Sequence, residues 1–125
     1  MNINYIILTN NPQVDDLITN KTNYQLLFRD GTIEDVIEKC EELFFAGKCV
    51  LAADPMAGRN ARPFPYLTII LQESDGDARI YDWNKLADFA ALHSKRVEES
   101  LSCSERIKND YGILDRSFTE AALKL

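Results

Sequence analysis

The sequence predicts an α/β protein built on a small, mostly parallel sheet of about four strands, with helices on both faces. Short apolar runs that do not alternate with polar residues are typical of strands buried on both faces. Segments with apolar residues at helical spacing separate these runs, which gives the order β-α-β-α-β-β-α-α. Two successive β-α-β units imply parallel strands joined by right-handed crossovers.

The first unit begins with a strand over residues 4–9, where apolar side chains follow one another. The strand ends at Asn10-Asn11-Pro12. Asn11 is a good helix N-cap, and Pro12 suits the first helical position because its missing N–H is not needed there. A short helix to about residue 20 is therefore predicted, followed by a second strand over Tyr24–Phe28.

The clearest helix signal follows Gly31. Thr32 serves as N-cap, and Asp35 three residues later forms a weaker relative of the capping box. An apolar stripe flanked by glutamates predicts that one helix face is buried in the core, and Gly47 is well placed to end the helix. The stripe consists of Ile33, Val36, Ile37, Cys40, Leu43 and Phe44.

The second half begins with a third strand over residues 49–53, predicted to be central because it is apolar without alternation. The loop over 54–65 is too short for a comfortable crossover helix, so the fourth strand over 66–72 is expected to be antiparallel or at an edge. Asp82 is predicted to cap a long helix reaching about residue 101, and a shorter helical piece follows from Tyr111. The inward positions of the long helix include Trp83, Leu86, Ala90, Val97 and Leu101.

Composition predicts one domain over residues 1–125 and excludes several classes of function. The chain is 46 % hydrophobic and 27 % charged, which suffices for a core without metal or disulfides. A net charge of −6 argues against a nucleic-acid groove and against binding to anionic membranes. No apolar run spans a bilayer, and the amino terminus lacks the positive charge of a signal peptide. Cys40, Cys49 and Cys103 show no paired spacing, which fits reduced thiols and a cytoplasmic location.

Two polar segments are candidate binding sites because each follows a predicted strand. Ligands of open parallel sheets gather at the carboxyl ends of the strands. Asn10 and Asn11 follow the first strand, where amide groups and a helix N-terminus suit an anion. Capping and turn formation are the preferred explanation of these asparagines, but a cap needs only one of them. The segment after the third strand contains Asp54, Gly58, Arg59, Asn60 and Arg62.

Arg59 and Arg62 give this second segment its chemistry. A guanidinium binds both oxygens of a carboxylate or phosphate, and the prolines around the arginines stiffen the loop. The alternative is an ordinary surface loop with solubilising charges. The functional hypothesis requires that both segments lie on one rim of the sheet.

Signatures of catalysis and cofactor binding are absent from the sequence. It contains neither G-x-G-x-x-G after the first strand nor G-x-x-x-x-G-K-[ST]. His93 is the single histidine and falls within a predicted helix, and three dispersed cysteines do not form a zinc motif. No catalytic residue, metal or cofactor is therefore predicted. Enzymatic activity stays open, with a non-enzymatic role preferred.

Two stretches carry a family resemblance. The first is Ile7-Leu8-Thr9-Asn10-Asn11-Pro12, and the second runs from Val50-Leu51-Ala52-Ala53-Asp54-Pro55-Met56-Ala57-Gly58 to Pro65-Tyr66-Leu67-Thr68-Ile69. Together they resemble the GrdX family, small proteins associated with the glycine/sarcosine/betaine reductase system of amino-acid-fermenting anaerobes. The likeness spans most of the first 72 residues and weakens afterwards.

The resemblance implies an accessory or regulatory protein that contacts proteins of a reductase complex or a small anionic ligand. The family tends to have histidine at the position of Asp54, and Lys-Pro-Asn where this chain has Asn60-Ala61-Arg62-Pro63, so no histidine-based role is carried over. The alternative hypothesis is a small-molecule binding α/β domain, or a small enzyme, that holds a carboxylate or phosphate through Arg59 and Arg62. Oligomeric state is left open by the sequence.

Overall fold

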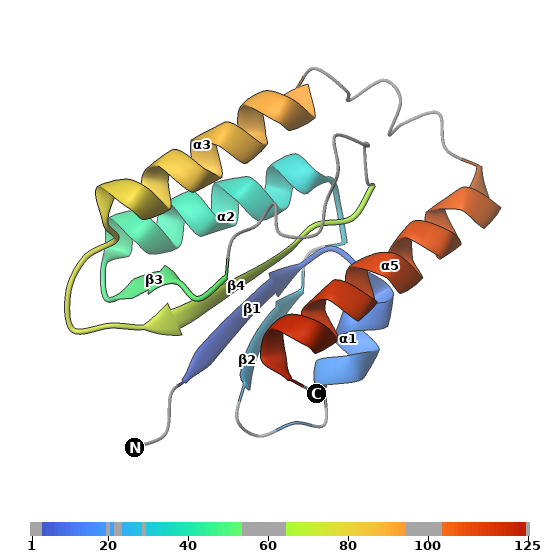
Figure 1. The fold of residues 1–125 in the computed structure, drawn as a ribbon, viewed down its shortest axis with the longest axis horizontal. Helices are drawn as coiled ribbons and strands as arrows, with labels where there is room; N and C mark the ends of the chain where they lie inside the picture. Colours follow the sequence, from blue (N-terminus) through green and yellow to red (C-terminus); the bar gives the residue numbers. More distant parts are fainter. Residues whose placement is uncertain are drawn as a thin grey trace.

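The computed structural model describes residues 4–19, 21, 24–28, 30–53, 65–94 and 104–124 (Figure 1). The described residues form four strands and four helices, and the predicted α/β class is confirmed. In chain order the elements are β1 (Tyr5–Thr9), α1 (Pro12–Ile18), β2 (Tyr24–Phe28), α2 (Ile33–Ala46), β3 (Cys49–Leu51), β4 (Thr68–Glu73), α3 (Ile80–Ser94) and α5 (Glu105–Leu123).

The four strands form one mixed sheet in the order β2-β1-β4-β3. Only β1 and β2 pair in parallel, and β4 runs antiparallel to both of its neighbours, β1 and β3. The prediction of a mostly parallel sheet was therefore wrong, whereas the antiparallel fourth strand is confirmed. The interior position of β4 has a physical cause. This strand is buried on both faces, at Thr68, Ile69, Ile70 and Leu71, so its backbone groups cannot bond to water and are best paired with a strand on each side.

The third strand was predicted to be central, but β3 lies at the edge of the sheet. Its side chains are buried all the same, and Cys49 and Leu51 pack in one core with residues of α2 and α3. Ala52 donates its backbone N–H to Ile70 in β4, so the N–H of Leu51 faces away from that strand. Asp82 of α3 accepts that N–H through Oδ1 at 3.2 Å. The buried side chain of Asp82 thus satisfies a backbone N–H of the edge strand that could otherwise pair with a strand of another chain.

Helices cover both faces of the sheet, as predicted. α2 and α3 pack on one face, while α1 and α5 pack against each other over the opposite face (Figure 1). Alternate residues of the central strands supply the two cores, which is the period-two pattern of a sheet buried on both sides. The first core includes Ile6, Leu8, Val36, Cys40, Leu86 and Phe89, and the second includes Ile7, Val14, Ile18 and Ile70.

The helix α2 agrees closely with its sequence signals. Thr32 and Asp35 form a complete capping box, in which each side chain bonds the other residue's backbone N–H. The predicted stripe faces the core. Gly47 ends the helix with φ at 84°, and Lys48 follows at 68°. The positive φ at this turn favours glycine, whereas the nearest atom to an added Cβ is the carboxylate oxygen of the exposed Asp77, which can move aside.

The helix α3 begins earlier than predicted. It starts at Ile80, which places Asp82 at the third helical position and not at the N-cap. There its carboxylate accepts the backbone N–H of Arg79 at 2.8 Å and the guanidinium of Arg79 at 2.8 and 3.0 Å. This is the carboxylate half of a capping box, combined with an ion pair. Residues 95–103, including the predicted inward positions Val97 and Leu101, lie outside the described residues.

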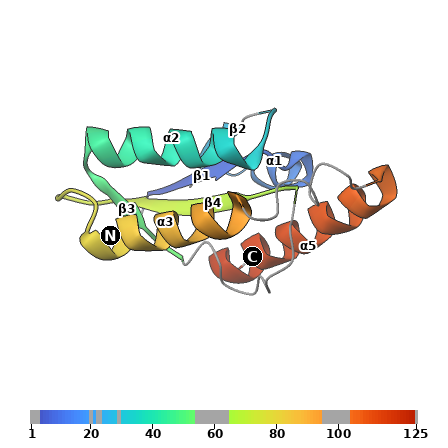
Figure 2. The same cartoon turned by 90° about the horizontal axis from the view of Figure 1, so that it is seen from above.

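The last helix, α5, is longer than predicted from the sequence. It begins at Glu105, with the hydroxyl of Ser104 accepting the N–H of Ile107 as N-cap. The prediction started only at Tyr111 because the preceding turn is polar and gives no apolar period. The first turns of α5 extend past the carboxyl edge of the sheet (Figure 2). The second half of α5 packs over β4 and α1.

Asp82 is the charged residue on which the β3–α3 contact depends. Burial by itself raises the pKa of Asp82, but hydrogen bonds from Arg79 and Leu51, together with the guanidinium charge, lower the pKa below its ordinary value. A carboxyl with a lowered folded-state pKa contributes stability above its unfolded pKa of about 3.9, and that stability is lost as the pH falls through the folded value.

We predict that Asp82→Ala lowers the free energy of unfolding by about 2 kcal/mol at neutral pH, because the buried N–H of Leu51 loses its partner. Urea denaturation measures the change. Asp88→Ala, at an exposed position of the same helix, is the matched control and should change the free energy by less than about 0.5 kcal/mol. The stability difference between wild type and Asp82→Ala should shrink below about pH 4. A difference that stays constant on acidification would contradict the assigned ionisation.

Candidate functional site

The candidate site from the sequence lies at the carboxyl end of β1, where Asn10 is held by three hydrogen bonds. Its side-chain amide donates to the carbonyl of Gly31 at 3.0 Å and to that of Pro65 at 3.1 Å. Its Oδ1 accepts the backbone N–H of Leu67 at 2.8 Å. Asn10 is only 4 % exposed. One side chain therefore joins the end of β1, the turn before α2 and the approach to β4.

Asn11 faces the opposite helical layer and is fully buried. Its Oδ1 accepts the N–H of Gln13, which confirms the predicted N-cap of α1. Its Nδ2 donates to the carbonyl of Gly112 at 2.9 Å and to Oδ2 of Asp115 at 3.0 Å. The cap of α1 is thereby also an anchor for α5, about a hundred residues later in the chain.

A chain of buried hydroxyls completes this contact. Thr68 donates its hydroxyl to Oδ2 of Asp115 at 2.6 Å. The hydroxyls of Thr9 and Thr68 are 2.9 Å apart, so Thr9 must be the donor between them because the proton of Thr68 is already engaged. Thr9 in turn accepts the backbone N–H of Asn11 at 3.0 Å. With the amide of Asn11 on the same carboxylate oxygen, the bonds form a closed ring of four residues, here called the Asp115 ring.

Three residues around this ring escaped the sequence analysis: Thr68, Gly112 and Asp115. Asp115 belongs to a helix segment that was predicted as packing only, and Thr68 reads as one more strand residue. Gly112 gives the usable signal, because glycine inside a helix costs about 1 kcal/mol and needs a reason. Here a Cβ would run into the side chains of Asn11 and Gln13, so glycine permits the close approach of α5.

The second predicted segment is only partly described. Asp54, Gly58, Arg59, Asn60 and Arg62 lie outside the described residues. Pro65, directly after that segment, is bonded to Asn10 at the carboxyl edge. The described part therefore brings one end of the predicted loop to the first polar segment. The assignment of all seven residues as ligand-binding stays a prediction.

The described residues offer little reactive chemistry. Cys40 and Cys49 are free thiols, and burial, with neighbouring acidic groups, raises the pKa of both, so neither thiolate is accessible. Across the described ranges, no three His, Cys, Asp or Glu side chains are grouped so as to hold a metal ion. Within the same ranges, no helix has the length and apolar character needed to cross a membrane.

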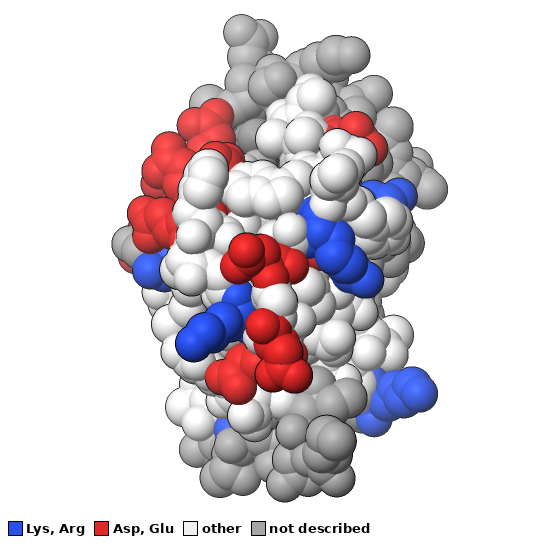
Figure 3. Space-filling view, turned by 90° about the vertical axis from the view of Figure 1, so that its left-hand side faces the viewer, with Lys and Arg blue, Asp and Glu red and all other residues white. Residues whose placement is uncertain are grey.

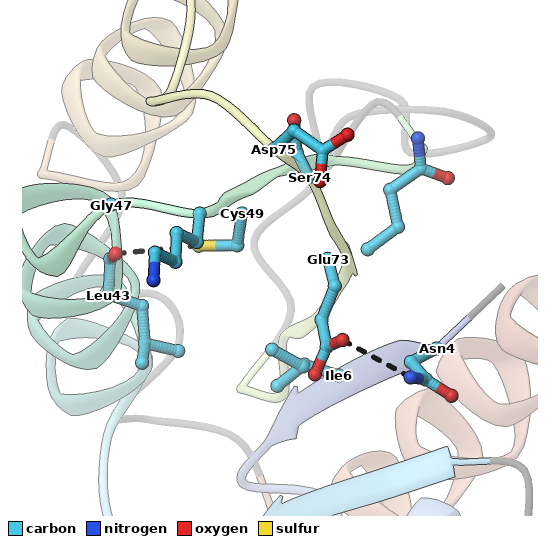
Figure 4. A pocket seen from close by; sticks show the side chains of 10 residues that line it. Asn4, Ile6, Leu43, Gly47, Cys49, Glu73, Ser74 and Asp75 are labelled. Carbon is cyan, nitrogen blue, oxygen red and sulfur yellow. Dashed lines mark hydrogen bonds between the residues drawn. The ribbon is translucent and has the colours of Figure 1, made fainter.

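A groove of about 820 Å³ lies at the opposite, amino end of the sheet (Figure 4). Ile6, Leu43 and Cys49 supply apolar lining, and polar side chains surround them. The amide of Asn4 donates to Glu73 at 3.1 Å, and the thiol of Cys49 donates to the carbonyl of Leu43 at 3.4 Å. An apolar floor with a few polar groups is the common form of a small-molecule site.

The charges around this groove are mixed. Among the described residues that line the groove, Lys48 supplies one positive charge, and Glu73 and Asp75 supply two negative charges. Repulsion from the two carboxylates disfavours a phosphate or other polyanion. A ligand that carries an amino group fits the lining better. The groove therefore differs in charge from the anion site predicted around Arg59 and Arg62.

Comparison with known proteins identifies one relationship. A family model described as "GrdX-like protein" matches residues 6–124, nearly the whole chain. No curated protein and no solved structure matches the chain. The resemblance seen in the first 72 residues thus extends through α3 and α5 to the carboxyl terminus.

The Asp115 ring yields a stability prediction. Asn11→Ala removes the N-cap of α1 and leaves Asp115 and Gly112 without the amide, so we expect a loss of about 2–3 kcal/mol in the free energy of unfolding. Asn11→Asp separates the loss of the N-cap from the loss of the amide donor. The aspartate can still cap α1, but it cannot donate a hydrogen bond to Gly112 or Asp115, and its carboxylate lies against that of Asp115. Both variants should be destabilised in urea denaturation, while Asn84→Ala, exposed on α3, should be near neutral. Wild-type stability for Asn11→Asp would show that capping alone matters.

Proposed function

We propose that this chain, which belongs to the GrdX-like protein family, is an accessory protein of a glycine reductase-type system. It acts in the cytoplasm by contact with a partner protein of that system. The contact site is a rim at the carboxyl edge of the sheet, for which the loop with Asp54, Gly58, Arg59, Asn60 and Arg62 supplies the contacting side chains and the buried Asn10 and Asn11 supply internal support.

The observation that carries this proposal is the set of three hydrogen bonds made by Asn10. They fix the turn at Gly31 and the segment entering β4 at one edge of the sheet. A partner meeting that edge finds loop ends that are already positioned, which lowers the entropy lost on binding.

The burial of Asn10 and Asn11 favours partner contact over direct ligand recognition by these two residues. Their amide groups are occupied within the chain, so binding a small anion would first require breaking those bonds. The two asparagines then shape the rim, and the charged residues of the loop supply its specificity. Arg59 and Arg62 suit carboxylate groups on a partner surface.

We predict that immobilised reductase-complex proteins bind the purified chain and that Arg59→Ala/Arg62→Ala weakens this binding at least tenfold, by loss of two guanidinium contacts. Biolayer interferometry measures the affinity. Lys21→Ala/Lys124→Ala is the control, since it removes the same charge from two exposed positions away from the rim. Absence of wild-type binding to every reductase component would refute the proposed function. Equal binding by the arginine variant would refute the rim alone.

The groove supports a second candidate function, binding of a small molecule with an amino group. A thermal-shift panel of amino acids, nucleotides and sugar phosphates tests it. Ligand at 100 times its dissociation constant stabilises a protein by about 2.7 kcal/mol, which is readily seen as a raised melting temperature. A shift with amino acids that Glu73→Gln/Asp75→Asn abolishes supports the groove. A shift with sugar phosphates that Arg59→Ala/Arg62→Ala abolishes supports the anion site of the loop.

A further inference from the structure

The strand β2 forms an edge of the sheet, so one side of its backbone pairs with β1 and the other side faces outward (Figure 1). Which residues face outward follows from β1. Asn4, just before β1, accepts the N–H of Glu73 at 3.0 Å, so alternate residues from Asn4 onward face β4, and Ile7 faces β2. In the parallel register Ile7 lies beside Leu26 and bonds the residues on either side of it, which leaves the N–H and C=O of Leu26 directed outward.

The outward backbone groups of β2 make no hydrogen bond in the part of the chain that the structure describes. By the same alternation they belong to Tyr24, Leu26 and Phe28. The other edge of the sheet differs, because Asp82 accepts the outward N–H of Leu51. The strand β2 also lacks a charged side chain, a proline and a bulge, the features that keep sheet edges from pairing. It therefore offers a template for another strand.

Surface charge sets β2 apart from the end of the molecule where α2 ends and α3 begins. That end carries acidic and basic side chains together (Figure 3). Interspersed charges of this kind keep a surface soluble and hinder unspecific association. The strand β2 is uncharged over its 5 residues, and Phe28 is 37 % exposed. An exposed, uncharged edge strand is a site for strand pairing.

We propose that the strand that pairs with β2 is β2 of a second copy of this chain, antiparallel to it about a two-fold axis through Leu26. The outward residues are evenly spaced about Leu26, so each meets an outward residue of the other copy. Leu26 meets the partner's Leu26, and Tyr24 meets the partner's Phe28. Such residues form hydrogen-bonded pairs that exchange both N–H···O=C bonds, and no other register pairs all of them. Because a two-fold axis relates the two edges, the interface is closed and isologous.

The side chains of β2 fit this register. Tyr24 and Phe28 lie on the same face of the sheet, where the ring of Tyr24 stacks on that of Tyr5 with centroids 5.7 Å apart. Pairing places the partner's Phe28 directly across from Tyr24, on the side away from Tyr5. Aromatic pairs across antiparallel strands stabilise a sheet, and the pairing removes apolar surface of Phe28 from water.

Charges at the ends of β2 are also complementary in this arrangement. Lys21 precedes the strand and Asp30 follows it, and both are exposed. Glu34 and Asp35 at the start of α2 add to the negative charge at the carboxyl end of the strand, whereas Arg29 lies outside the described residues. Antiparallel pairing reverses the ends, so Lys21 of each copy approaches the acidic end of the other. A parallel pairing of the same two strands would bring like charges together.

Two features make the dimer weak. Its contact consists mainly of one strand from each copy, which is well below the size of a stable interface. Asp15 and Asp16 of α1, the helix that packs on β2, are negative in both copies and oppose association. Dimers therefore form only at raised protein concentration. The pairing uses none of the residues of the proposed partner rim, so it does not depend on the proposed function.

Sedimentation equilibrium from micromolar to millimolar protein, at physiological salt, tests the dimer. We expect a reversible monomer–dimer equilibrium for wild type, and Phe28→Lys should weaken it at least tenfold, because it removes the aromatic pair and places a charge on the edge. Ile80→Lys is the matched control, since Ile80 is 79 % exposed on α3, which contacts the opposite edge through Asp82. Far-ultraviolet circular dichroism checks that both variants fold. A wild-type chain that stays monomeric overturns the proposal, as does a dimer unaffected by Phe28→Lys.

Hydrogen exchange with residue resolution tests the register. The amides of Tyr24, Leu26 and Phe28 should exchange rapidly at low micromolar concentration and slowly at millimolar concentration, because pairing bonds them only in the dimer. The amides of Gln25 and Leu27, which face β1, are the internal control and should be slow at both concentrations. Outward amides whose exchange does not depend on protein concentration overturn the proposed pairing.

Discussion

The fold at the carboxyl edge depends on the Asp115 ring, a closed set of buried hydrogen bonds. A buried carboxylate is tolerated only where donors compensate for the water it has lost. Here Thr68 and Asn11 donate to Asp115, and Thr9 donates onward to Thr68. Two donor paths lead from Asn11 to Asp115, one direct through the side-chain amide and one through the hydroxyls of Thr9 and Thr68, and along the hydroxyl path each bond polarises the next. This ring joins β1, β4 and α5 and thereby attaches the last helix to the sheet through polar contacts.

A second buried carboxylate performs the corresponding task on the other face of the sheet. Asp82 begins α3 and bonds the outward N–H of Leu51 in β3. In both places a helix presents an aspartate to the sheet, and the bonds specify where the helix docks while apolar packing stabilises it. The mixed sheet follows from the same logic, since β4 is buried by helices on both faces and paired on both edges.

These internal contacts show which polar groups have a structural role and are not free to bind other molecules. The amides of Asn10 and Asn11, the two buried aspartates and the two described thiols are all engaged or shielded inside the chain. Among the described residues, the groove at the amino end of the sheet is open to other molecules, and the proposed partner rim would add a second surface. An accessory role in a reductase system fits a molecule whose distinguishing features are contact surfaces.

The sequence by itself determined the local structure: the capping box of Thr32 and Asp35, the cap by Asn11, the buried stripe of α2 and the bounds of β2. These features depend on residues within one or two turns of each other, so the local sequence pattern is enough to predict them. The family resemblance of the first half was likewise readable. Only the tertiary structure decided that β4 lies between β1 and β3, that Asp82 covers an edge strand, and that Asn11 bonds Asp115. Those outcomes join residues 20 to 104 positions apart, and no local pattern specifies which of several buried partners a strand or a polar side chain will meet.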